Sequence, residues 1–428
     1  MTGTNTTDFD VHPAIDRLWR EIENREDELN QLIANLVWYQ SVLGSEADVQ
    51  HFVAGHLQLS GLETDVWDIE ESLKELPESG DSGVPFEGRP NVAGIQRGAG
   101  GGRSLIVNGH VDVVSPEPLD NWTYDPWAAE VVENRMYGRG ALDMKAGVAI
   151  NLMLPRWLRD VGIQTRGDIV IQSVIEEECT GNGALDMSRR YQADAAIITE
   201  PTGGSFTQAH VGVMWFKIRV KGRSAHAAVA PTGVNAISKM VPIIRALEDL
   251  DRELNEGSHP SFEGIDHPIN LNIGVMSSGD WPSTVPGMAE LDCRVSFYPG
   301  KTVEEMRSEI EQAVRHASQT DNWLQENPPE VVYHGFQSGG STVSMDEPHV
   351  QLLGSWHQYL NGSAMAPRSG TGTNDMRYFN FAGIPCGCYG PGGAGPHAAD
   401  EYLDLSTVVP TAKVLAAFML DWCGIVDE

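Results

Sequence analysis

The 428-residue sequence is poor in cysteine and in lysine, with five and seven residues, respectively. The cysteines are too few and too scattered for a disulfide framework, and the pair in "CGC" lacks the second pair of a zinc ribbon. We therefore expect free thiols that are buried in the fold. The five are Cys179, Cys293, Cys386, Cys388 and Cys423.

Positive charge is also scarce, because 29 basic residues face 60 acidic residues and leave a formal net charge of −31. Polyanions would be repelled, which excludes nucleic acid and anionic membranes as partners. The chain has no uninterrupted run of 18 apolar residues, and its N-terminus lacks the basic and apolar regions of a signal peptide. We expect a cytoplasmic protein. The excess of acidic residues is typical of proteins from salt-rich habitats. The alternative is that it reflects the general amino-acid composition of proteins in the source lineage.

Short β-rich runs alternate with helical patterns in the first half of the chain. This alternation predicts an α/β fold with a doubly wound, mostly parallel sheet covered by helices. The expected helices are 13–43, 46–59, 145–160, 183–190 and, near the end of the chain, 406–422. The expected strands are 64–69, 91–95, 104–109, 168–175 and 195–199. The polar stretch 71–89, rich in glycine and proline, is predicted to be a surface loop.

A different pattern begins near residue 209, where strand, helix, strand, strand and helix follow one another. The expected strands are 213–222, 269–279 and 289–299, and the expected helices are 233–254 and 302–319. This order is typical of a small ferredoxin-like α/β sandwich. Because 428 residues exceed the usual size of one core, we predict a catalytic domain of residues 1–208 and 335–428 with an inserted domain of residues 209–334.

Metal-type ligands follow several of the predicted strands. Side chains alternate along a strand, so His110 and Asp112 in "VNGHVDVV" point the same way. A second strand runs into the acidic triplet 176–178, and a third runs into Glu200. Each acid alone is explained by a helix cap or a solvated loop charge. Together they indicate a site, because ligands bind outside the carboxyl ends of the strands in such sheets.

Two imidazoles and three carboxylates form the candidate metal site: His110, Asp143, Glu178, Glu200 and His397. This donor set suits zinc, with cobalt or manganese as alternatives. Five ligands exceed the three of a single catalytic zinc, whereas one shared carboxylate would let the set hold two divalent ions and a bridging water. Glu177, beside Glu178, is the candidate general base.

The motifs around these residues resemble those of a known family. They are "GHVDVV", "YGRGALDMK", "IEEECTGNG", "ITEPTG", "KGRSAHAA", "TNDMRYF" and "YGPGGAGPHAADEY". Their order and spacing resemble the acetylornithine deacetylase and succinyl-diaminopimelate desuccinylase metallopeptidases, a family that also includes aminoacylases and G-type carboxypeptidases. The resemblance covers nearly the whole chain. It implies that Asp143 bridges two ions, one completed by His110 and Glu200 and the other by Glu178 and His397.

The same resemblance implies roles for three residues that are not ligands. Asp112 would orient His110. Glu177 would take a proton from the bridging water and return it to the leaving amine. In relatives, the histidine that matches His226 reaches the partner's active site across a dimer interface and stabilises the tetrahedral oxyanion; an ordinary surface histidine is the alternative. The resemblance therefore implies a homodimer formed through the inserted domain.

Substrate contacts are implied at Arg294, Ser283 and Gly392. Arg294 matches an arginine that binds a substrate carboxylate, and an ion pair at the rim is the alternative. Ser283 lies in "WPSTVPG", where the family usually has asparagine, so the specificity of relatives does not transfer directly. Gly392 belongs to a loop that lets the backbone approach substrate or that only forms a turn.

The sequence thus predicts a two-metal amide hydrolase that releases the amine from an N-acyl amino acid or a similar small amide. A dipeptidase or carboxypeptidase with the same chemistry and a catalytically silent binding member are the alternatives. A silent member has no need of an acid such as Glu177 beside the ligands. A serine or cysteine hydrolase is disfavoured, because no Gly-x-Ser-x-Gly motif occurs and Cys179 has no evident base.

Overall fold

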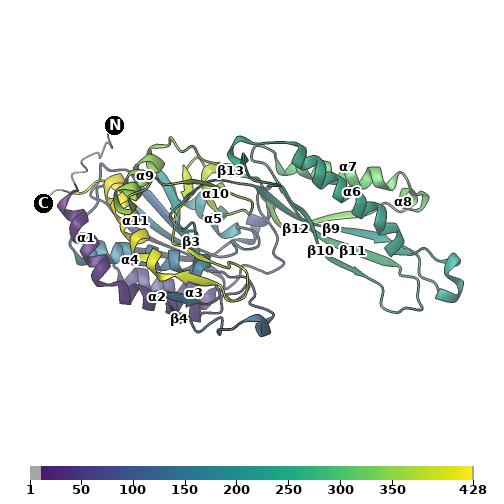
Figure 1. Cartoon of the computed structure of the whole chain (residues 1–428), viewed down its shortest axis with the longest axis horizontal. Helices are drawn as coiled ribbons and strands as arrows, with labels where there is room; N and C mark the ends of the chain where they lie inside the picture. Colours follow the sequence, from purple (N-terminus) through teal and green to yellow (C-terminus); the bar gives the residue numbers. More distant parts are fainter. Residues whose placement is uncertain (1–10, 427–428) are drawn as a thin grey trace.

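The computed structural model describes residues 11–426, which form a thick body and a narrower arm (Figure 1). The arm is residues 212–338, and the body is the rest of the described chain. The chain leaves the body after β8 (Phe206–His210) and returns at β13 (Ser341–Thr342), and these two strands pair with each other. The predicted domain boundaries at 209 and 334 fall inside β8 and inside β12 (Glu330–Ser338). Residues 1–10 and 427–428 of the predicted catalytic domain lie outside the described residues.

A nine-stranded sheet forms the centre of the body. Besides β8 and β13, its strands are β1 (Glu63–Asp68), β2 (Pro90–Gln96), β3 (Leu105–His110), β6 (Ile169–Val174), β7 (Ala195–Ile198), β14 (Pro367–Gly370) and β15 (Cys386–Cys388). Their order is β1-β2-β6-β3-β7-β15-β8-β13, with β14 beside β8. The inner strands β6, β3, β7 and β15 are parallel, whereas β1, β2 and β13 pair antiparallel. The predicted mostly parallel α/β sheet is confirmed.

Helices cover both faces of this sheet. They are α1 (Pro13–Asn24), α2 (Glu26–Trp38), α3 (Ala47–Leu59), α4 (Ala146–Asp160), α5 (Asn182–Arg190), α9 (Pro348–Asn361), α10 (Met376–Phe381) and α11 (Val408–Cys423). α3, α4 and α11 contact the sheet on one side, and α5 and α10 contact it on the other (Figure 1). Because both faces are covered, β3, β6 and β7 are buried along their whole length, and most of their residues are apolar.

Two predictions for the body need correction. The single helix expected over 13–43 is two helices that meet at Arg25, where φ is −115° and ψ is 24°. Residues 23–28 are all polar, so no apolar contact holds a continuous helix there. No helix was predicted for residues 348–361, which form α9.

Apolar and cysteine side chains are buried as expected. All five cysteines are free and buried, which confirms the prediction of free thiols. Within residues 11–426, one helical stretch, Leu405–Cys423, is long and apolar enough to cross a membrane. About 67% of its apolar window is buried, and α11 contacts α1, α4 and α9, so this stretch is a core helix of the body.

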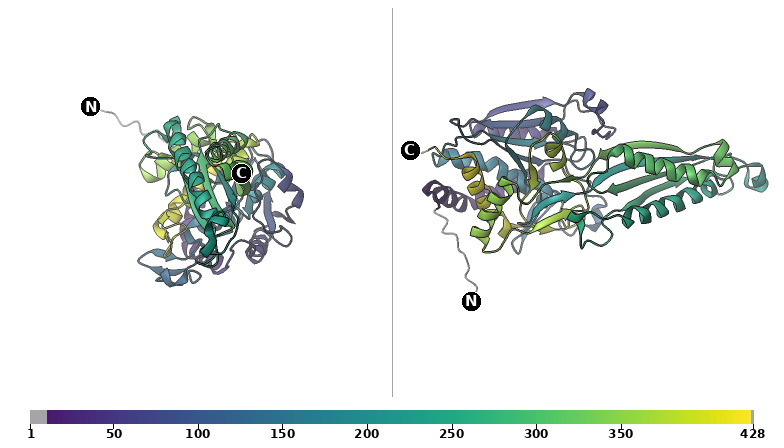
Figure 2. Two further views of the ribbon diagram at one scale, coloured as in Figure 1. Left: turned by 90° about the vertical axis from the view of Figure 1, so that its right-hand side faces the viewer. Right: turned by 90° about the horizontal axis from the view of Figure 1, so that it is seen from above.

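The arm is a four-stranded sheet with helices on one face only (Figure 2). Its strands are β9 (Gly212–Lys221), β10 (Leu271–Ser278), β11 (Met288–Phe297) and β12, in the order β10-β11-β9-β12, and its helices are α6 (Ala236–Glu256), α7 (Val303–Ser318) and α8 (Asn322–Glu326). Along β9, Phe216 and Ile218 are buried against the helices, whereas Lys217 and Arg219 alternate with them on the open face. The predicted inserted α/β sandwich is confirmed.

Candidate metal centre

Three parallel strands bring predicted ligands to one edge of the central sheet. His110, at the end of β3, pairs with Val174 of β6. Val174 is followed two residues later by the acidic triplet 176–178. β7 lies on the other side of β3 and ends two residues before Glu200. The carboxyl ends of β3, β6 and β7 therefore supply side chains to the same point, as expected for this class of sheet.

Two other segments bring the remaining predicted ligands to this edge. Asp143 lies in the irregular helical turn Ala141–Lys145, directly before α4. His397 lies in the loop between β16 (Gly393–Ala394) and β17 (Tyr402–Asp404), which form a small third sheet with β5 (Arg135–Tyr137) and β4 (Glu130–Val132). Because β17 pairs with β5, the segment that leads to Asp143 and the loop that carries His397 are joined by one sheet.

Asp143 lies between the two imidazoles. Its Oδ1 atom is 3.4 Å from Nε2 of His110, and its Oδ2 atom is 3.6 Å from Nε2 of His397. The oxygens of Glu178 are 3.0 and 3.2 Å from Nε2 of His397, and Oε1 of Glu200 is 3.7 Å from Nε2 of His110. The five predicted ligands thus form two groups that share Asp143, and in each group the ligand atoms lie within 4.8 Å of one another.

The arrangement around His110 fits a cation. Nδ1 of His110 lies 3.0 Å from the backbone carbonyl of Asp112, which can only accept, so Nδ1 carries the hydrogen and the lone pair is on Nε2. This Nε2 atom is buried and has no hydrogen-bond partner within residues 11–426. Its neighbours are carboxylate oxygens, which are also acceptors. Acceptors gathered around one buried point need a cation, and the donor set suits divalent zinc, cobalt or manganese.

The pKa values of the predicted ligands also indicate that negative charge is concentrated at this site. Burial raises the pKa of Glu200 well above its usual range, and Asp143 raises it further. Burial alone would raise the pKa of Asp143, but the nearby imidazoles of His110 and His397 hold it below its usual range. Asp143 and Glu178 raise the pKa of His397 to about 10. Divalent cations would take the place of the protons that these groups otherwise attract.

Asp112 supports both the histidine and the acidic triplet. Its backbone carbonyl, rather than its carboxylate, makes the short contact with His110; Oδ1 lies 3.7 Å from Nδ1. The carboxylate instead accepts from the backbone N–H groups of Glu177 at 3.2 Å and Glu178 at 3.0 Å. Burial raises the pKa of Asp112 to about 7. Asp112 therefore fixes the ends of two neighbouring strands relative to each other.

Glu177 lies beside the five predicted ligands and is itself within reach of a cation, because its carboxylate, that of Glu178 and the ring of His110 form a third possible ligand group. The residue is 6% exposed, and Oε2 is 4.0 Å from Nε2 of His110. Burial raises its pKa well above its usual range. A buried carboxyl group with a raised pKa can accept and release a proton near neutral pH.

A cavity of about 370 Å³ opens onto this centre. Its polar lining comes from Thr202, Thr207, Thr371, Thr373, Asn374 and Arg368, together with Asp143, Glu177, Glu178, Glu200 and His397. Within residues 11–426, every side chain that lines the cavity belongs to the body. The arm of the same chain thus leaves one side of the cavity open.

The other predicted site residues lie outside the cavity. His226 and Ser283 are exposed neighbours in the arm: the amide of Ala227 donates to the carbonyl of Ser283 at 2.8 Å. Arg294, on β11, donates at 3.3 Å to the carbonyl of Thr371, which lines the cavity.

Gly392 is buried and does not line the cavity. Its amide donates to Oγ1 of Thr407 at 2.9 Å, and a Cβ atom at this position would lie 3.1 Å from Cα of Gly203. The absence of a side chain here permits close packing of two loops.

Sequence reasoning missed two acids that support the site. Glu401 pairs with Arg139 at 2.6 Å and accepts from the backbone N–H of Asp143 at 3.0 Å, so it holds the loop of the shared carboxylate. Asp375 is buried, neither of its oxygens has a hydrogen-bond partner within residues 11–426, and burial raises its pKa to about 6. Both lie in motifs quoted above, "HAADEY" and "TNDMRYF", so an acid within a site motif was the available signal.

Comparison with known proteins agrees with this geometry. Residues 106–421 match the model of peptidase family M20/M25/M40. The chain is 30% identical to N-formyl-4-amino-5-aminomethyl-2-methylpyrimidine deformylase from Bacillus subtilis, over 95% of this chain and 97% of that protein. It is 31% identical to acetylornithine deacetylase from Vibrio cholerae, over 78% of this chain and 84% of that protein. The structure of the di-peptidase Dug1p from Saccharomyces cerevisiae is similar in fold, with a TM-score of 0.78 and 14% identity over 96% of this chain and 98% of that one.

Proposed function

The chain belongs to peptidase family M20/M25/M40, a family of metal-dependent hydrolases of amide bonds, and from that premise we propose that it is a two-metal deacylase. Its substrate would be a small N-acyl amino acid or a related N-acyl amine, from which it releases the amine. The observation that carries the proposal is the position of the buried acid Glu177 beside two ligand groups that share Asp143.

The two ligand groups would hold two divalent cations. His110, Asp143 and Glu200 would bind one ion, and Asp143, Glu178 and His397 would bind the other. When bound, such ions polarise the amide carbonyl and lower the pKa of water. Zinc is the first candidate, with cobalt or manganese as alternatives.

Proton transfer would be the work of Glu177. Its carboxylate takes a proton from the attacking water and gives it to the nitrogen of the leaving amine. The raised pKa lets the carboxyl group hold this proton until the C–N bond breaks. Asp112 keeps the backbone of Glu177 in place during both transfers.

Two features support a small acyl group and a polar amine. The relatives named above are a deformylase and a deacetylase, and formyl and acetyl are both small acyl groups. The cavity is lined mainly by threonines, Asn374 and charged groups rather than by apolar side chains. Arg294 and Ser283 would contribute to binding once the open side of the cavity is covered.

A second copy of the chain would cover that side. β10 is an edge strand of the arm sheet, and its Val275 and Met276 are 59% and 46% exposed. Ile237 and Val241 on the neighbouring helix α6 are also exposed. Exposed apolar residues along a strand edge are typical of an interface. We infer a homodimer through the arm, in which His226 of one copy completes the site of the other.

A substrate panel tests this proposal. The metal-reconstituted protein and its Glu177→Gln variant are assayed for amine release from N-formyl-4-amino-5-aminomethyl-2-methylpyrimidine, N-acetylornithine, other N-acyl amino acids and dipeptides. We expect turnover of at least one N-acyl amine by the parent and none by the variant. Turnover of dipeptides alone would favour the dipeptidase alternative, and equal turnover by both proteins would refute the role of Glu177.

A further inference from the structure

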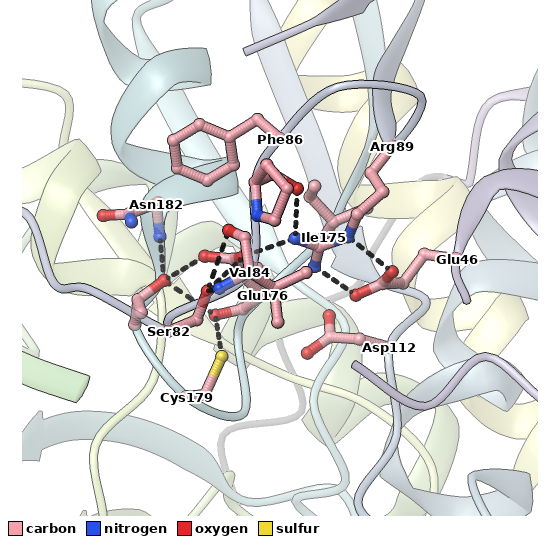
Figure 3. Close-up of polar contacts among 12 residues, drawn as sticks. Glu46, Ser82, Val84, Phe86, Arg89, Asp112, Ile175, Glu176, Cys179 and Asn182 are labelled. Carbon is pink, nitrogen blue, oxygen red and sulfur yellow. Dashed lines mark hydrogen bonds and ion pairs between the residues drawn. The ribbon is translucent and has the colours of Figure 1, made fainter. Parts of the chain in front are cut away.

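The stretch predicted as a surface loop, 71–89, contains a buried ionic cluster. Arg89 is 4% exposed and lies between two fully buried carboxylates. Its Nε and Nη2 atoms donate to Glu46 at 2.8 and 2.6 Å, and its Nη1 atom donates to Glu176 at 2.7 Å (Figure 3). The end of this stretch is therefore part of the interior, which corrects the sequence-based prediction.

Stability alone does not explain such a cluster. Moving charges out of water is costly, and apolar residues of similar size often serve a buried position at least as well. Three buried charges in one cluster are better explained if they hold a segment of the backbone in a defined position. The part of the chain they fix is the beginning of the acidic triplet 176–178.

Glu176 faces the interior and is held at every polar atom of its side chain. Oε1 accepts from Arg89 and from Oγ of Ser82 at 2.9 Å, and Oε2 accepts from Oγ1 of Thr180 at 2.7 Å (Figure 3). Its carbonyl accepts from the amides of Thr180 at 3.1 Å and Gly181 at 2.6 Å. These contacts form a rigid anchor directly before Glu177.

The backbone at Glu176 needs such an anchor. Its φ angle is 64°, in the left-handed region, where a residue with a side chain is disfavoured. This conformation turns the chain between Glu176, which faces Arg89, and Glu177, which lines the cavity. Loosening Glu176 would thus let the carboxylate of Glu177 move.

We propose that Arg89 is a positioning residue for hydrolysis, which through Glu176 sets the place of the Glu177 carboxylate in the cavity. Ser82 assists from the same loop, because it binds the same oxygen of Glu176. This inference rests on the proposed role of Glu177 as the base. It assigns a catalytic consequence to a loop that does not line the cavity.

Conservative variants of the cluster test the proposal. In Arg89→Lys the charge stays, but a single ammonium group cannot make the forked contacts of a guanidinium. We expect kcat to fall about 30-fold with KM within about twofold of the parent, because misplacement of a reacting group by about 1 Å can cost 100-fold. Ser82→Ala removes one hydrogen bond and should lower kcat about fivefold, again at constant KM.

Asp186→Asn is the matched control. Asp186, on α5, is a buried carboxylate that pairs with Arg190 at 3.0 Å and accepts from Nε1 of Trp67 at 2.7 Å, and it makes no contact with the acidic triplet. All variants are assayed well below the melting temperature of the least stable one. The control should lose stability but keep the parental kcat.

Each result decides the proposal. If kcat of Arg89→Lys falls no further than that of Asp186→Asn, Arg89 is only structural and the proposal is overturned. If Arg89→Lys does not fold, Ser82→Ala decides, and an unchanged kcat there overturns the proposal. Glu177→Gln is assayed in parallel: if it keeps parental kcat, the proposed function fails as well, whereas an inactive Glu177→Gln beside unaffected cluster variants removes only the positioning role.

Discussion

The body and the arm both combine helices with a β-sheet, but they bury the sheet differently. The body covers both faces, and burial at the edge of its sheet raises the pKa values of Glu177 and Glu200. Burial alone would lower the pKa of His110, but the carboxylates around it outweigh this effect and raise its pKa. The arm covers one face and leaves apolar side chains exposed along β10. The candidate ligands and Glu177 are thus placed where packing on both faces fixes them, whereas the one-sided sheet leaves apolar side chains exposed to solvent.

The variant Asp143→Asn is the strongest test of metal binding by the body. The change removes the carboxylate that lies between both imidazoles, so both ions should bind weakly. We expect kcat/KM to fall about a thousandfold or more, because several kcal/mol of metal-derived stabilisation are lost. Activity and elemental analysis of the purified protein measure the effect. Parental metal content in the variant would contradict a shared ligand.

For the arm, His226→Ala tests a contribution to chemistry without a contribution to metal binding. Loss of one donor to an oxyanion costs about 3 kcal/mol, so kcat should fall roughly 100-fold. Metal content should stay at the parental level. His316→Ala, which removes another exposed histidine of the arm, is the control. Equal activity of both variants would show that His226 is an ordinary surface histidine without a role in hydrolysis.

The proposed interface is tested by a charge on the edge strand. Val275→Asp places a carboxylate on exposed β10 and should convert a dimer into a monomer, as measured by light scattering after gel filtration. Activity should fall toward that of His226→Ala, because the second copy no longer completes the cavity. Leu59→Asp, at an exposed apolar position of the body, should leave the dimer intact. A monomeric parent protein would remove the interface.

Acid should destabilise the protein through buried histidines of the body. Burial lowers the pKa of His210 to about 3 and that of His349 to about 4, below the unfolded value near 6.5. Their stabilising contribution is complete above pH 6.5 and is lost as the pH falls through the folded pKa values. At pH 5 each should cost about 2 kcal/mol.

His349→Phe isolates one of these contributions. The change keeps an aromatic ring beside Trp422 but removes the titrating group. Urea denaturation at pH 8 and pH 5 should show a loss of stability between the two that is smaller in the variant by about 2 kcal/mol. An identical loss in both proteins would assign the acid sensitivity to other groups.

Site residues could be placed correctly from the sequence where a single rule of strand geometry determines their position. Parallel strands end at one edge, so His110, the triplet 176–178 and Glu200 could be placed together from the strand pattern alone. His397 comes from a loop without such a rule, and only the family motif placed it with the others. Glu401 was missed because its contact is with Asp143, 258 residues earlier in the chain. The buried end of the loop 71–89 was missed for the same reason, since Glu176 is 87 residues from Arg89.

The arm is joined to the body by two neighbouring connections, one after β8 and one before β13, which pair with each other. Around this ribbon the base of the elongated arm is tied to the body at further points (Figure 1). The amide of Gly335 donates to the carbonyl of Asp81 at 2.8 Å, and Arg294 donates to the carbonyl of Thr371 at 3.3 Å. A braced arm would present its exposed β10 edge at a constant angle to the cavity, while the ligand cluster is held entirely by the body.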